Sequence, residues 1–130
     1  MVAAGTGITP MLQLIRGILS NGDDETALSL VFQNRGLEDI LLRDELDALV
    51  AANPGRLTVT YVLSKPHDGW DSADGRHVGG HITADLLRNQ LPAPADGDTL
   101  VCLCGPGGFN EAMQNLFAEI GHEGDGVYEF

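Results

Sequence analysis

The chain has 130 residues, of which 43% are hydrophobic, and 19 acidic side chains outnumber seven basic ones to give a formal net charge of −12. This length supplies one buried core, and we expect a single domain over residues 1–130. The negative charge argues against nucleic acid and anionic membranes as partners, because both select clusters of Lys and Arg. Apolar runs fall far short of the about 18 residues that a membrane span needs.

Residues 2–11 read Val-Ala-Ala-Gly-Thr-Gly-Ile-Thr-Pro-Met, and apolar side chains then recur at helical spacing. The pattern predicts the end of a strand, a tight turn from Gly5 to Gly7, and a helix capped by Thr9 with Pro10 as its first residue. Such a turn directs backbone N–H groups and a helix N-terminus toward one point. An anionic ligand is favoured there.

The rest of the chain alternates two periodicities. Apolar and β-branched runs predict strands at residues 27–33, 57–63, 99–104 and 126–130. Helical spacing predicts further helices at residues 37–52, 82–91 and 109–120. Gly22 suits the end of the first helix, and Thr83 suits the start of the third. Five strands separated by helices indicate an α/β fold, with a parallel five-stranded sheet between two helical layers.

Residues 64–80 form the longest segment without periodicity and contain the only tryptophan. Loops of this length in a compact domain tend to be functional or mobile. We expect Trp70 to anchor this loop against the sheet.

A second glycine turn, residues 105–108, follows the strand at 99–104. Ligands of open parallel sheets lie beyond the carboxyl ends of the strands, where the strand order reverses, and both turns can lie on that edge. Gly5-x-Gly7-x-x-Pro10 lacks the third glycine of the dinucleotide fingerprint, and no GKS or GKT follows, which excludes a P-loop. The first turn alone fits a nucleotide site and a purely structural turn equally well.

Cys102 and Cys104 lie two residues apart in a predicted strand, so they share a face and cannot easily form a disulfide with each other. Two thiols do not make a zinc site, and the four histidines lack metal-ligand spacing, so we expect no metal. Free thiols are typical of a reducing compartment, which indicates a cytoplasmic location.

Several segments occur together in one order: AAGTGITPMLQLIR at 3–16, FQNRGLEDILLRDEL at 32–46, YVLSKP at 61–66, Trp70 with Gly80-His-Ile, CGPGGF at 104–109, and the terminal Phe130. In this combination the chain resembles the NAD(P)H-binding lobe of the ferredoxin–NADP reductase superfamily. The closer likeness is to NADH–cytochrome b5 reductases. The resemblance implies a Rossmann-like, ferredoxin reductase-like C-terminal NADP-linked domain.

The resemblance also implies roles for individual residues. The family's first glycine turn borders the nicotinamide and pyrophosphate, with Thr6 close to the flavin–nicotinamide contact. Cys104 matches a cysteine beside the nicotinamide carbon that gives up hydride, although a buried free cysteine is more often a small hydrophobe. Cys104 and Thr6 are assigned to the catalytic step. The implied cofactor-binding residues are Gly5, Thr6, Gly7, Thr9, Pro10, Asn34, Arg35, Asp39, Cys104, Gly105, Pro106, Gly107, Phe109 and Phe130.

The loop after the second strand bears on the choice between NADH and NADPH. An acidic side chain accepts a hydrogen bond from the ribose 2′-hydroxyl, whereas arginine favours a 2′-phosphate. The family's specificity-bearing acid corresponds to Asp39, or to its neighbour Glu38, which indicates NADH. Arg35 in the same loop leaves NADPH open. The alternative for each of these charged residues is a solvated position at the start of a helix, with no role in binding.

The chain departs from the family at Cys-Gly-Pro-Gly-Gly-Phe, where members commonly carry CGPPPM. The variant is similar to the subgroup in which a cytochrome b5 domain shares the chain. Only residues 1–4 precede the first turn, and the family's flavin motif does not occur, so we expect a fragment whose preceding domain holds FAD.

The implied partners are that FAD-binding domain and, as electron acceptor, cytochrome b5 or a b5-like domain. Parts outside the fragment could hold the protein on the cytoplasmic side of the endoplasmic reticulum. Two alternatives stay open: another acceptor, such as nitrate or an iron–sulfur protein, and a non-catalytic nucleotide-binding or interaction module.

Overall fold

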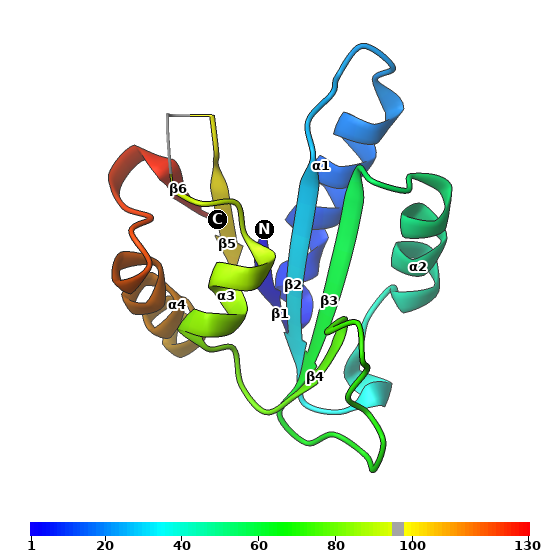
Figure 1. Ribbon diagram of the computed structural model, residues 1–130, viewed down its shortest axis with the longest axis vertical. Coiled ribbons are helices and arrows are strands. Elements are labelled where there is room, and N and C mark those ends of the chain that lie inside the picture. Colours follow the sequence, from blue (N-terminus) through cyan, green and yellow to red (C-terminus); the bar gives the residue numbers. More distant parts are fainter. Residues whose placement is uncertain (95–97) are drawn as a thin grey trace.

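The computed structural model describes residues 1–94 and 98–130. Within these ranges the strands form one parallel sheet in the order β4-β3-β2-β1-β5-β6 (Figure 1). The six strands are β1 (Val2–Ala4), β2 (Leu28–Asn34), β3 (Leu57–Leu63), β4 (His77–Gly79), β5 (Val101–Cys104) and β6 (Val127–Glu129). The parallel sheet is confirmed, but the predicted count of five strands omitted β4.

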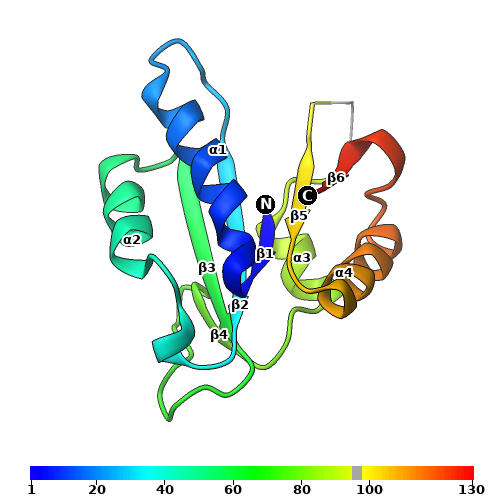
Figure 2. The ribbon, with the colours of Figure 1, turned by 180° about the vertical axis from the view of Figure 1, so that it is seen from behind.

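Four α-helices cover the sheet: α1 (Ile8–Ser20), α2 (Arg43–Ala52), α3 (Ala84–Gln90) and α4 (Gly107–Glu119). Three short 3₁₀ turns accompany them at Gly5–Gly7, Leu37–Asp39 and Gly124–Gly126. Figures 1 and 2, which view the molecule from opposite sides, place α1 and α2 on one face and α3 and α4 on the other. The predicted three-layer α/β architecture is confirmed.

The strand order reverses at β1. The chain moves outward from β1 through β2 and β3 to β4, and then crosses by α3 to the other side of β1 to form β5 and β6. Residues beyond the carboxyl ends of β1 and β5 therefore lie at the point where crossovers diverge to opposite faces. A crevice forms at such a point in open α/β sheets.

Each face of the sheet carries its own apolar core. Leu30 and Phe32 of β2 pack on one face with Ile15 of α1, while Val31, between them in sequence, packs on the other face with Phe117 of α4. All five side chains are essentially inaccessible to solvent. Burial of each such side chain contributes about 1.5–3 kcal/mol, which explains why this central strand is apolar at successive positions.

The start of α1 differs from the prediction. The helix begins at Ile8 and follows a 3₁₀ turn directly, so Thr9 lies inside the first helical turn and is not the N-cap. Its hydroxyl donates to the Thr6 carbonyl at 3.1 Å. Pro10 still falls in the first turn, where no intrahelical partner is required for its nitrogen. The reason for the shift is that the preceding turn is itself helical.

The predicted helix over residues 37–52 is broken in two. A 3₁₀ turn at Leu37–Asp39 comes first, and α2 begins only at Arg43. Between them Leu42 adopts a left-handed backbone with φ of 58°, an unusual conformation for a branched residue. Asp39 explains the early break, because its carboxylate accepts from the Gly36 N–H at 2.9 Å and closes a local turn.

Three helix ends were predicted with mixed success. The C-cap of α1 is Asn21 with an extended backbone, so the assignment of Gly22 as the cap is wrong. The helix predicted at residues 109–120 begins at Gly107, and Gly121, with φ of 89°, follows its end. Thr83 caps α3 as predicted, since its hydroxyl accepts from the Leu86 N–H at 3.2 Å.

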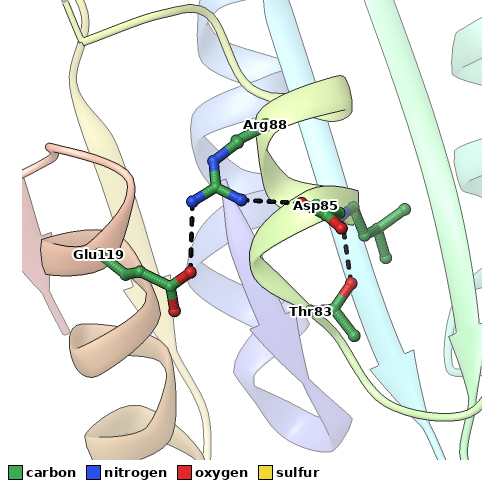
Figure 3. A network of polar contacts seen from close by, with 5 residues as sticks. Thr83, Asp85, Arg88 and Glu119 are labelled. Carbon is green, nitrogen blue, oxygen red and sulfur yellow. Dashed lines mark hydrogen bonds and ion pairs between the residues drawn. The ribbon is translucent and has the colours of Figure 1, made fainter.

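Arg88 makes one ion pair within α3 and one that connects α3 to α4. Figure 3 shows Arg88 of α3 bonded to Asp85 at 2.8 Å and to Glu119 of α4 at 3.2 Å. The side chains are substantially exposed, so each pair contributes at most about 1 kcal/mol. The apolar contacts beneath them hold this layer to the sheet.

Trp70 anchors the long loop, as predicted. Its indole N–H donates to the Val78 carbonyl at 3.1 Å, and its ring stacks on His77 with centroids 4.5 Å apart. Both partners belong to β4, which pairs with β3 through Tyr61 and His77. The three-residue strand was missed because it depends on these tertiary contacts and has no periodicity of its own.

We expect Trp70→Ala to lower the free energy of unfolding by about 3–5 kcal/mol, because it removes a buried ring and its hydrogen bond. Trp70→Phe keeps most of the ring and should cost about 1 kcal/mol. Chemical denaturation measures both values, with Leu41→Ala at an exposed site as a control that should stay within about 0.5 kcal/mol. Equal losses for the two Trp70 variants would contradict the anchoring role.

Candidate nucleotide site

The two predicted glycine turns lie next to each other at the reversal point of the sheet. Ala3 pairs with Cys104, so β1 and β5 end at the same level. The first turn leaves β1 through Gly5, whose φ of 54° suits glycine, and leads into α1. The second leaves β5 at Gly105 and leads into α4. Two helix N-termini therefore begin beside one pair of strand ends.

Both turns require glycine, because neighbouring atoms lie too close to leave room for a side chain. A Cβ on Gly7 would overlap the Cys104 carbonyl, with the Cys104 carbonyl carbon at 2.6 Å and the Gly105 nitrogen at 3.1 Å. A Cβ on Gly105 would overlap the ring of Phe109 and come within 3.3 Å of the Ala4 side chain. Each turn thus packs its backbone directly against the other strand's end.

The electrostatics of this edge favour an anion. Neither α1 nor α4 has a side-chain N-cap, and the first turn of each contains no acidic residue. The N–H groups of these turns are therefore not occupied by capping side chains, and both helix dipoles add positive potential there. Thr6 and Thr9 are exposed beside α1, and Pro106 and Gly107 are exposed beside α4. A dinucleotide's pyrophosphate fits this donor set.

The end of β2 adds an amide and a cation to the edge. Both polar atoms of the Asn34 side chain are buried and lack a hydrogen-bond partner among the described residues. Such a group is usually satisfied by water or ligand, since leaving it unpaired costs about 1–3 kcal/mol. Arg35 follows and is exposed, and its carbonyl accepts from the Lys65 N–H at 2.8 Å. Neither Arg35 nor Lys65 forms an ion pair with a described residue.

Asp39 lies farther out, in the 3₁₀ turn after β2. Its side chain is exposed, and one carboxylate oxygen is engaged by the Gly36 N–H. The second oxygen has no recorded hydrogen bond among the described residues. The neighbouring Glu38 carboxylate lies over Gly36, where a Cβ would meet its oxygens at 2.9 and 3.0 Å. Both acids therefore lie in the loop after β2, to which sequence reasoning assigned the choice between NADH and NADPH.

Phe130 lies at the other end of this edge, beyond β6. Its N–H donates to the Leu103 carbonyl at 2.9 Å, which ties the terminal residue to β5. Its ring is 48% exposed and packs edge-on against Tyr128, with centroids 4.9 Å apart. Phe130 is therefore not part of the buried core. Cys104, at the end of β5, is partly exposed and its thiol is free.

The structure brings most of the predicted residues to one edge. Residues 5–10 and 104–109 form the centre, Asn34 and Arg35 lie at the adjacent strand end, and Asp39 and Phe130 lie on opposite flanks. Sequence reasoning missed Lys65 and Tyr128. Lys65 could have been found from its place directly after a predicted strand, whereas Tyr128 gives no sequence signal separate from that strand.

Comparison with known proteins agrees with this geometry. The family model described as the oxidoreductase NAD-binding domain matches residues 1–115. The chain belongs to this family. Its NAD-binding description agrees with the edge built by the two glycine turns.

Relatives within this family are longer than the chain. NADH-cytochrome b5 reductase 2 of Danio rerio is 41% identical over 132 residues, which cover 100% of the chain and 40% of the relative. The cytochrome b5 reductase domain of Ulva prolifera nitrate reductase is 36% identical with a TM-score of 0.91, covering 100% of this chain and 47% of that one. The CS-b5R domains of human Ncb5or, in an NAD+ form, are 30% identical with a TM-score of 0.82, covering 99% and 35%. The chain therefore spans less than half the length of each.

Among the described residues, no helix combines the length and the apolar character needed to cross a bilayer.

Gly7→Ala should weaken NADH binding by at least tenfold and cost about 1–3 kcal/mol of stability, because its methyl group would push the first turn away from Cys104. The matched control is Gly17→Ala, in the same helix, where nothing lies within 4 Å of a Cβ. This control should leave binding unchanged and stabilise by about 0.5–1 kcal/mol. Titration calorimetry and thermal unfolding measure both effects. Equal NADH affinity in the two variants would refute the close-approach argument.

Proposed function

We propose that this chain is the pyridine-nucleotide lobe of a flavin-dependent oxidoreductase, with the nicotinamide end of NADH held at Thr6 and Cys104. The bound nucleotide supplies hydride to an FAD carried mainly by a separate domain of the complete polypeptide, from which electrons pass singly to a haem acceptor such as cytochrome b5. The observation that carries the proposal is the meeting of two uncapped helix N-termini at the reversal point, in a chain of the NAD-binding family.

The first glycine turn and the start of α4 bind the pyrophosphate in this proposal. Backbone N–H groups and helix dipoles do this without a P-loop lysine. Glycine at positions 7 and 105 lets the two turns pack closely, because a side chain at either position would collide with neighbouring atoms. Asn34 supplies a buried amide one strand away, which a ribose or a bound water can satisfy.

Cys104 acts as a positioning residue in this mechanism. It lies at the end of β5, level with Ala3, and its partly exposed side chain packs against the core on the α1 face with its thiol free. No covalent step is required of it, because hydride transfer belongs to the cofactors. A compact, polarisable side chain there sets the approach of the ring, and Thr6, on the facing turn, bounds the same space.

We infer a preference for NADH, with weaker use of NADPH. Asp39 supplies an acceptor for the ribose 2′-hydroxyl and repels a 2′-phosphate, and its neighbour Glu38 is the alternative for this role. Arg35 and Lys65, at the ends of adjacent strands, supply the opposite charge within the same region. The name of the Danio rerio relative includes NADH, which supports this order.

The names of the relatives support the choice of electron acceptor. Cytochrome b5 is named for the Danio rerio relative, and a nitrate reductase contains the Ulva prolifera domain. Delivery of electrons within a nitrate reductase is therefore the second candidate. The net charge of −12 makes this lobe a poor surface for steering an acidic cytochrome, so docking would rely on the flavin domain or on covalent fusion.

We propose a cytoplasmic location, where free thiols such as Cys102 and Cys104 persist. Contact with the endoplasmic reticulum would come from other parts of the complete polypeptide.

In the complete reductase, Cys104→Ala should lower the rate of flavin reduction by roughly 10- to 100-fold while the KM for NADH changes little, because the ring is bound but misplaced. Stopped-flow absorbance of the flavin measures the rate. Cys102→Ala is the control: this side chain is buried in the same strand, and its loss should lower stability without slowing reduction. An unchanged rate of flavin reduction in Cys104→Ala would contradict the positioning role.

Asp39→Asn should lower the NADH-to-NADPH ratio of kcat/KM by roughly tenfold, equivalent to about 1.4 kcal/mol. Asparagine keeps one acceptor oxygen for the Gly36 N–H, removes the charge and turns the second acceptor into a donor. Glu38→Gln is the matched control and should leave the ratio unchanged. If only the Glu38 variant altered the ratio, the assignment to Asp39 would be wrong.

A further inference from the structure

His81 lies on the carboxyl edge of the sheet, outside the two glycine turns. It belongs to residues 80–83, which join β4 to α3 and run along the carboxyl ends of the strands (Figures 1 and 2). Gly80 begins this segment with φ of 102°, a conformation that suits glycine, and its N–H donates to the Leu63 carbonyl at 2.8 Å. The segment is therefore attached to the end of β3 before it crosses to α3.

The Gln33 side chain holds the same segment against β2. Its amide nitrogen lies 2.9 Å from His81 Nδ1, and its amide oxygen accepts from the Ile82 N–H at 3.3 Å. Gln33 shares a face of the strand with Val31, which packs in the core beneath α4, and Ile82 belongs to that core as well. The pair formed by Gln33 and His81 therefore lies on the α3/α4 face of the sheet.

These two contacts determine which nitrogen of His81 carries the proton. The Ile82 N–H needs an acceptor, so the Gln33 oxygen faces Ile82 and the amide NH₂ group faces His81. Nδ1 must then accept, and a neutral imidazole in that state carries its N–H at Nε2. Since the two ring nitrogens lie on opposite sides of the ring, Nε2 points away from Gln33. His81 is exposed, and no described residue accepts from Nε2, so the ring presents an unused donor.

This donor lies beside the end of β1. Gln33 pairs with Ala4, the residue before the first glycine turn. Ala4 shares a face of its strand with Val2, which packs in the α3/α4 core, and a Cβ on Gly105 would come within 3.3 Å of the Ala4 side chain. On this face the end of β1 is therefore bordered by Gln33 and His81 on the β2 side and by the second glycine turn on the β5 side.

We propose that His81 donates a hydrogen bond from Nε2 to the pyrophosphate of the bound dinucleotide, and that Gln33 positions the ring by fixing its tautomer. The proposal rests on the proposed function of this edge and adds a side-chain donor to it. A phosphate oxygen is the acceptor because the N-termini of α1 and α4 meet at the end of β1. The ribose is a poorer choice, since Asp39 precedes α2, which covers the other face (Figures 1 and 2).

The tautomer is tested by ¹⁵N NMR of the histidine side chains in the complete reductase at pH 8, where imidazole is ordinarily neutral. His81 should carry its proton at Nε2, with Nδ1 unprotonated. ADP contains the diphosphate without nicotinamide, and its addition should shift the Nε2 resonance, whereas adenosine should not. A proton at Nδ1, or an Nε2 resonance that ADP leaves in place, would overturn the proposal without any variant.

Two substitutions separate the roles of the two nitrogens. The short amide of His81→Asn reaches only the position of Nδ1, so it keeps the contact with Gln33 and loses the outward donor. The KM for NADH should rise roughly tenfold while the rate of flavin reduction at saturating NADH stays within about twofold, because this bond is the same in the ground state and the transition state. The inhibition constant of ADP should rise by the same factor. His81→Gln places an NH₂ group near the position of Nε2 and should recover most of the affinity.

His67→Asn is the matched control. This histidine is also exposed, but its ring packs edge-on against Trp70, with centroids 5.6 Å apart, in the loop before β4. Its KM for NADH should be unchanged. An unchanged KM in His81→Asn would overturn the proposal, and equal rises in the Asn and Gln variants would assign His81 a structural role instead.

Gly7→Ala distinguishes failure of this proposal from failure of the proposed function. A raised KM for NADH in Gly7→Ala together with an unchanged one in His81→Asn would overturn the role of His81 alone. A complete reductase that neither uses NADH nor binds ADP would overturn both.

Discussion

The contact between Gly7 and the Cys104 peptide is the constraint on which the site depends. Because a methyl group cannot fit between them, the turn after β1 can lie flat against the end of β5 only when residue 7 is glycine. That contact brings the N-terminus of α1 beside the N-terminus of α4, and it places the turn that carries Thr6 next to Cys104. Without it, two separate strand-to-helix turns would remain, each a weak anion site.

The two edges of the sheet differ in chemistry. The carboxyl edge carries uncapped helix N-termini, an unpaired buried amide and two cations, all suited to a polar anionic ligand. The amino edge carries a cavity of about 810 Å³, lined by residues from both faces of the sheet. Cavity volume alone would direct attention to the amino edge, but the backbone donors and the cations that suit a nucleotide lie at the carboxyl edge. The chain has a net charge of −12 and only seven basic residues, and two of these, Arg35 and Lys65, lie at the carboxyl edge.

Sequence reasoning recovered what depends on periodicity and on local residue chemistry. The apolar runs located β2 and β3 closely, and Thr83 identified the start of α3. Sequence reasoning failed where tertiary contacts determine the secondary structure. β4 exists because Trp70 and Tyr61 hold His77 against the sheet, and the break before α2 exists because Asp39 closes a turn that helical spacing cannot reveal. For the site, the glycines were visible in sequence, but their mutual contact required the strand order, and the exposure of Phe130 required the position of β6.

The central claim is that the nucleotide binds where the two glycine turns meet. Its most direct test is a map of backbone amide chemical shifts of this chain, by ¹H–¹⁵N NMR, as NADH is added. We expect the largest changes on residues 5–9 and 104–108, with smaller changes at Asn34 and Arg35 and none around Leu28 or Leu100. Changes concentrated at the amino-edge cavity, with the glycine turns unaffected, would contradict it.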